Sequence, residues 1–364
     1  MSPALQLDGL LSLGLEPGYR SDGSSVDSSH QNVAPPGAVT LTADLGGRCA
    51  IGPAEQMNSA PIQLMLPRWL HHKVEARLEH LLRPIGSAEE DFLEPRGEPA
   101  LLPPDSVSWK IFKNPLGLYI GGVAAVVLQL AEPRVGSGVW QYTTFRQHPL
   151  ERLQRTGHAA MMTVYGPRSR TEQMIAGVTR LHARVRGSAP DGQAFCASDP
   201  ELLEWVHATA CFGFLEAYHA YVQPLTLLER DRFFSEGGPA AELYGARSVP
   251  ESQSALEALF ARMSGQLRPS DIVLEFLRIM QRLPALPAPL RPLQGVLAKA
   301  AIEVIPAGLR DRIGLGKAWS LAPLQRILVC RAGGAAERVV LSTNPAVHAC
   351  RRLQLPDDFL YAHR

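Results

Sequence analysis

A helical repeat of apolar residues extends from Trp109 to about Met263, and it constrains the fold of this 364-residue chain more than any other feature. Apolar residues that recur every three or four positions line one face of an α-helix, whereas a half-buried strand shows strict alternation. Hydrophobic residues make up 46% of the chain, which is enough for a sizeable core. The pattern predicts an all-α helical bundle.

Start and stop signals divide this segment into helices that we predict over about 149–165, 170–186 and 199–222. The sequences Ser169-Arg-Thr-Glu172 and Ser198-Asp-Pro-Glu201 have the spacing of capping boxes, and each is expected to begin a helix. The intervening turns are predicted at Gly166-Pro167 and at Asp191-Gly192.

The strongest apolar run covers residues 116–128. It is shorter than the roughly 18–20 residues that span a bilayer, so we expect a buried core helix and no membrane span. Peripheral membrane association stays open. Outside this run, further helices are predicted near 66–82, 270–283 and 295–305, and the segments 327–330 and 338–341 fit either short strands or helix.

Composition suggests three regions and a cellular setting. Residues 1–60 have the Gly, Ser, Pro and Asp content of a loop-rich arm, residues 61–325 form the expected helical domain, and residues 326–364 form a C-terminal extension. The net charge of +1 argues against nucleic acid as a partner. Five scattered cysteines without a CxxC pair, and no signal-peptide pattern, predict reduced thiols and a cytoplasmic protein.

Two arginines and a hydroxyl share one face of the first of these helices. Arg152, Arg155 and Thr156 follow the spacing of neighbouring helical side chains. Each planar guanidinium can bind a carboxylate through two hydrogen bonds, so the pair suits a ligand with two carboxylates. Ordinary surface arginines on a solvated helix face would give the same spacing.

Two histidines lie among apolar residues of the next two helices. His182 shares a face with Met174, Val178 and Leu181, which suggests either a hydrogen-bonded core histidine or a ligand to a metal or haem iron. His207 is a polar exception on an otherwise apolar helix. We expect it to line a pocket or to serve the core rather than to bind metal.

In combination, these motifs resemble the family of latex-clearing proteins (bacterial rubber oxygenases) and the fungal oxygenase of mycophenolic-acid biosynthesis. The resemblance rests on Arg152-x-x-Arg155-Thr156, the Tyr-Gly turn, His182-Ala-x-Val-Arg186 and Asp199-Pro-x-Leu-Leu-x-Trp-Val-His207-Ala-Thr. It continues through Pro-Leu-Arg-Pro to Ile305-Pro-Ala-Gly-Leu-Arg310, and covers roughly residues 107–319.

The resemblance implies a globin-like helical bundle that holds haem b, with His182 as the proximal ligand of the iron. It implies that Arg152, Arg155 and Thr156 shape the distal side, and that Arg152, Arg186 and His207 are candidates for contact with the cofactor. Arg155 stands where rubber oxygenases have lysine. No acid occurs between Pro133 and Leu150 to match their upstream glutamate, and Glu132 is the nearest.

The leading hypothesis is an oxidoreductase, a haem b oxygenase that uses O2 on an apolar, isoprenoid-like substrate. A non-catalytic helical ligand-binding protein is the second hypothesis. The third is a non-haem metal held by His182, His207 and a carboxylate such as Glu216. The sequence gives no indication of the oligomeric state.

Overall fold

The structure is a computed structural model that describes residues 90–283, 291 and 293–362. The described part is all-α, as predicted, with a single antiparallel hairpin of β1 (Arg186–Ser188) and β2 (Ala194–Cys196). The helices are α3 (Glu90–Leu93), α4 (Val107–Phe112), α5 (Pro115–Leu130), α6 (Pro133–Tyr142), α7 (Pro149–Tyr165), α8 (Arg168–His182), α9 (Pro200–Tyr221), α10 (Leu227–Glu236), α11 (Gly238–Tyr244), α12 (Gln253–Ser264), α13 (Asp271–Arg282), α14 (Gln294–Glu303), α15 (Ala307–Arg312), the 3-10 helix η3 (Lys317–Trp319), α16 (Pro323–Ala336) and α17 (Pro345–Arg352). The predicted helix at 66–82 and the arm at 1–60 lie outside the described residues.

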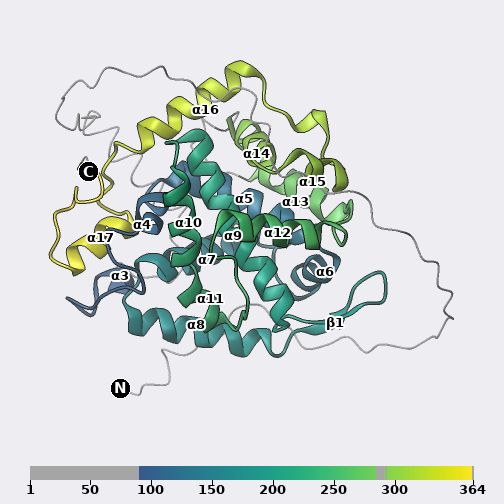
Figure 1. The fold of residues 1–364 in the computed structure, drawn as a ribbon, viewed down its shortest axis with the longest axis horizontal. Helices are drawn as coiled ribbons and strands as arrows, with labels where there is room; N and C mark the ends of the chain where they lie inside the picture. The colour runs from purple at the N-terminus through teal and green to yellow at the C-terminus, as the bar shows by residue number, and fades with distance from the viewer. Residues whose placement is uncertain (1–89, 284–290, 292, 363–364) are drawn as a thin grey trace.

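Helices α5 and α9 form the centre of the molecule, and the other helices pack around them (Figure 1). Their backbones meet at two glycines: a Cβ on Gly213 would lie 2.3 Å from the carbonyl oxygen of Gly121, and a Cβ on Gly121 would lie 2.7 Å from that of Gly213. No side chain fits at either position. The glycines of the apolar run therefore serve close helix packing.

Helix α5 contains the apolar run and is buried along most of its length, as expected for a core helix. Among the described residues, no single helix is long and apolar enough to cross a membrane. In the part of the chain that the structure describes, the pair of α5 and α6 passes that test together, and the two helices are bent by 107° relative to each other.

Helices α7 and α9 begin and end where the sequence predicts, but α8 does not. It ends at His182 rather than near residue 186, because Arg186–Ser188 leaves the helix to pair with β2. His182 is consequently the last residue of a helix and not the middle of one. The predicted turn is present at the hairpin tip, where Gly192 has φ +85°.

Both predicted capping boxes are wrong. At α8 the N-cap is Pro167, and the side chain of Glu98 accepts the backbone N–H of Ser169 at 2.6 Å. At α9 the N-cap is Asp199, whose carboxylate accepts the N–H of Cys196 at 2.8 Å and so faces backward along the chain. A distant acid thus takes the role that local spacing assigned to Ser169, and α9 begins without a side-chain cap.

The segment 327–330 lies within α16, so the helical alternative holds and the strand alternative is wrong. Helix α16 crosses the expected boundary between residues 325 and 326 and packs on α5, α9 and α14. In Figure 1 it lies along the upper edge of the molecule, whereas α8 lies along the lower edge.

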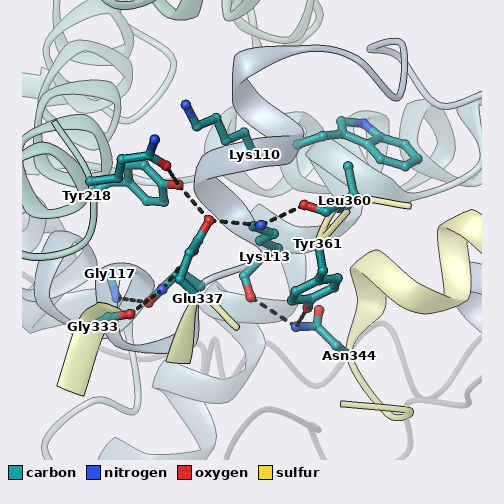
Figure 2. Close-up of polar contacts among 12 residues, drawn as sticks. Lys110, Lys113, Gly117, Tyr218, Gly333, Glu337, Asn344, Leu360 and Tyr361 are labelled. Atoms are coloured by element: carbon teal, nitrogen blue, oxygen red, sulfur yellow. Dashed lines mark hydrogen bonds and ion pairs between the residues drawn. The ribbon is translucent and has the colours of Figure 1, made fainter. Parts of the chain in front are cut away.

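A buried polar network joins the C-terminal residues to the central helices (Figure 2). The carboxylate of Glu337, just after α16, accepts Lys113 Nζ at 2.8 Å, Tyr218 Oη at 2.7 Å and Asn114 Nδ2 at 3.0 Å. Lys113 Nζ also donates to the carbonyl of Leu360 at 2.7 Å. Each charge is therefore compensated inside the protein.

Candidate functional site

The candidate site is built on the hairpin of helices α7 and α8. The helices are joined by Gly166 and Pro167, and the hydroxyl of Thr171 donates to the carbonyl of Met162 at 2.9 Å across the turn. A Cβ at Gly166 would lie 2.6 Å from that carbonyl, so the tight turn requires glycine. Arg152, near the start of α7, is close enough to His182 at the end of α8 for its charge to lower the pKa of the imidazole.

The two arginines at the start of α7 differ in their partners. Arg155 forms an ion pair with Glu151 one turn earlier. Arg152 donates to the hydroxyl of Thr156 at 2.7 Å, and that hydroxyl donates to the Arg152 carbonyl at 2.8 Å. No carboxylate among the described residues pairs with Arg152. Burial, with the neighbouring Arg155 charge, lowers the pKa of the Arg152 guanidinium.

His182 lies next to this arginine, at the end of α8. Burial, followed by the charge of Arg152, lowers the pKa of the His182 imidazole, which therefore stays neutral at pH 7. Its Nδ1 is buried and has no hydrogen-bond partner in the described part of the chain. A buried polar atom without a partner costs about 1–3 kcal/mol, so this nitrogen is available to a bound ligand or a water molecule.

The imidazole of His182 and the guanidinium of Arg152 together suit a ligand that combines a metal ion with a carboxylate. A neutral imidazole can bind a metal ion, and an unpaired guanidinium can bind a carboxylate. A short way along α7, a Cβ on Gly157 would have no atom within 4 Å, so this stretch of the helix is open. These residues fit haem b, which combines an iron with two propionates.

His207 lies in a different environment on α9. Its Nε2 is 3.4 Å from the sulfur of Cys211, and a Cβ on Gly237 would lie 2.9 Å from the same nitrogen. Burial lowers the pKa of His207 to about 4. The described contacts place its ring against the junction of α10 and α11, and none of them joins it to His182.

Arg186 lies in β1 rather than in α8, and its side chain is exposed. Its carbonyl accepts the hydroxyl of Tyr142 at 2.6 Å. The hairpin thus fixes the backbone at Arg186, while the guanidinium is free to reach a ligand at the protein surface. No described contact joins it to His182.

The acidic residues that the sequence suggested for the site serve structural roles. Glu132 is buried and caps α6, accepting the N–H of Val135 at 2.8 Å and pairing with Arg134 at 2.7 Å. Glu216 is paired with Arg230. Within residues 90–283 and 293–362, no group of three or more His, Cys, Asp or Glu side chains is arranged to hold a metal ion.

Sequence reasoning missed Glu151. Its charge and its position four residues before Arg155 were a sufficient signal, since acid–base pairs at this spacing attract on a helix. The pair matters because it leaves Arg152 as the arginine without an acidic partner.

Comparison with known proteins identifies the family of the chain. The family model described as the catalytic domain of the ER-bound oxygenase mpaB/B'/rubber oxygenase matches residues 109–338, more than half of the chain. The chain belongs to this oxygenase family. The match contains α7, α8 and α9, and hence the arginines, the threonine and the histidines of the candidate site. No curated protein and no solved structure matches the chain.

Membership of the mpaB/rubber oxygenase family makes the protein an oxygenase, and thus an oxidoreductase that uses O2. It confirms the resemblance drawn from the Arg152, His182 and His207 motifs. It also favours an enzyme over the non-catalytic ligand-binding protein.

Proposed function

We propose that this oxygenase is haem b-dependent and acts on an apolar, isoprenoid-like substrate, with His182 as the ligand to the iron. The observation that supports this most is the buried Nδ1 of His182, which has no hydrogen-bond partner among the described residues, near the guanidinium of Arg152, which has no acidic partner there. An iron and a propionate would satisfy both.

His182 would hold the iron, because its depressed pKa leaves the imidazole neutral and able to coordinate. Arg152 is the first candidate for a propionate partner, and the exposed Arg186 is the second. His207, whose described contacts are with Cys211 and the α10–α11 junction, is not part of this proposed haem contact.

When bound, haem b supplies an iron centre that activates O2. The chain would contribute positioned hydrogen-bond donors. Thr156 and Arg155 provide a hydroxyl and a guanidinium on the face of α7 that carries Arg152, where they can stabilise negative charge that develops during the reaction. Glu151 holds Arg155 in place for that role.

The substrate class is proposed by analogy with the rubber oxygenases that the family description names. With Glu132 committed to capping α6 and Glu216 paired with Arg230, neither acid is available to act on the substrate. An apolar substrate with an oxidisable double bond needs no such group for recognition.

The test is O2 consumption by the haem-reconstituted protein with squalene as the probe. We expect uptake of O2, and incorporation of the 18O label into product from labelled O2, only when both haem and squalene are present. Equal turnover without haem would contradict the haem proposal. Haem binding without any O2 uptake across a set of apolar alkenes would contradict the substrate class.

A further inference from the structure

Helix α16 exposes an apolar face to solvent. Leu324 is 79% exposed, Ile327 48% and Leu328 44%. With Arg331 and Ala335 they recur at intervals of three and four residues, so they share one face of the helix. Exposed leucines that lie singly need no explanation, but a row of them marks an interaction surface.

The opposite face of α16 is fixed to the protein. Val329 and Gly333 are buried, and a Cβ at Gly333 would lie 2.3 Å from the carbonyl oxygen of Tyr221. The C-terminal end is held through Glu337, which pairs with the buried Lys113 (Figure 2). The helix cannot turn its leucines inward, so the outward face is a permanent feature of the fold.

The exposed charged side chains on α16 and directly before and after it are all basic. Helix α16 contains two arginines and no acid. Arg326 is paired with Glu303, whereas Arg331 lies among the leucines and is exposed. Lys317 and Arg338, before and after the helix, are exposed as well. A convex row of large apolar side chains with basic neighbours matches an anionic lipid surface, where leucines enter the acyl boundary and cations meet headgroups.

We propose that the outward face of α16, formed by Leu324, Ile327, Leu328 and Arg331, docks this protein on anionic phospholipid membranes. In Figure 1 α16 and α8 lie along opposite edges of the molecule, so docking leaves the end of α8 that carries His182 away from the lipid. The proposal does not depend on haem or on the substrate.

The experiment is flotation of the full chain with vesicles of phosphatidylcholine, alone or with about 30% phosphatidylserine. We expect binding to the anionic vesicles that weakens with salt. The triple variant Leu324→Ser/Ile327→Ser/Leu328→Ser should bind roughly tenfold or more weakly. Arg331→Glu should weaken binding to the anionic vesicles and leave the result with phosphatidylcholine alone unchanged.

The double variant Leu227→Ser/Leu228→Ser is the matched control, because these leucines are 65% and 79% exposed but begin α10 instead. It should bind like the wild type, and circular dichroism melts should show that all variants are folded. Equal binding by the triple variant and the wild type would overturn the proposal. Failure of the wild type to bind any vesicle would overturn it as well. If, in that case, the triple variant converts a dimer of the chain into a monomer, this face is an interface between two copies of the chain instead.

Discussion

At the scale of single residues, the environment of His207 predicts a pH dependence of stability. Burial lowers its pKa to about 4 in the folded protein, whereas an unfolded-chain histidine titrates near about 6.5. Between these values the unfolded chain binds more protons, so the free energy of unfolding falls as the pH drops from about 6.5 to about 4. His207→Gln should remove up to about 3 kcal/mol of that fall.

Urea unfolding at several pH values across this window measures the effect. The reference is the wild-type slope, measured alongside that of His148→Gln, in which an exposed imidazole is replaced. If His207→Gln retains the wild-type slope, the histidine is not buried in its neutral form.

The two arginines of α7 should contribute unequally to haem affinity. Arg152 has no acidic partner among the described residues, whereas Arg155 is already paired with Glu151. A charge-assisted hydrogen bond contributes about 1.5–3 kcal/mol, so Arg152→Leu should weaken haem b binding about tenfold or more. Titration of the protein with haem, followed by absorption, should show a smaller loss for Arg155→Leu. A larger loss for Arg155→Leu would reverse our assignment of the two roles.

At the scale of elements, the contact between α5 and α9 should tolerate no added methyl group. Gly213→Ala places a Cβ 2.3 Å from a backbone oxygen that cannot move without shifting a core helix. We expect a loss of about 3 kcal/mol in the free energy of unfolding.

Gly334→Ala is the matched control, since nothing lies within 4 Å of its Cβ. It should be neutral or stabilise α16 by about 0.5–1 kcal/mol, because alanine favours a helix. Chemical denaturation of both variants gives the comparison. Equal stability of the two would mean that α5 and α9 pack less closely than described.

Elements were predictable where their limits are set by neighbouring residues. Pro149 and the Gly166-Pro167 turn define α7, and Pro200 defines the start of α9. The end of α8 was not predictable, because it depends on pairing between Arg186 and Cys196, which are ten positions apart. The cap of α8 comes from Glu98, about seventy positions earlier, and no local spacing indicates it.

The same distinction applies to the site. The motif of Arg152, Arg155 and Thr156 was visible in the sequence as a helix face. That the charge of Arg152 acts on His182 depends on how two helices pack, and the family resemblance, which implied a distal place for Arg152 and a proximal one for His182, did not indicate it. The separation of His207 from His182 required the three-dimensional arrangement of α9 and α11.

At the scale of the whole molecule, the network around Glu337 ties the C-terminal residues to the centre (Figure 2). The side chains of Lys113 and Glu337 are only 6% and 16% exposed, so the loss of one leaves a buried charge. Lys113→Met should lower the free energy of unfolding by about 3 kcal/mol.

The double variant Lys113→Met/Glu337→Gln removes both charges and keeps an acceptor for Tyr218. It should be more stable than Lys113→Met alone in the same denaturation experiment. If the double variant is the less stable of the two, Glu337 stabilises the fold through its other partners and not through the lysine.

The central claim, that His182 holds haem b, is tested most directly by the pyridine haemochrome content of the reconstituted protein. Wild type and His207→Gly should each contain about one haem per chain. His182→Gly should lose it, and added imidazole should restore both the haem and its Soret band. A full haem content in His182→Gly without imidazole would contradict the claim.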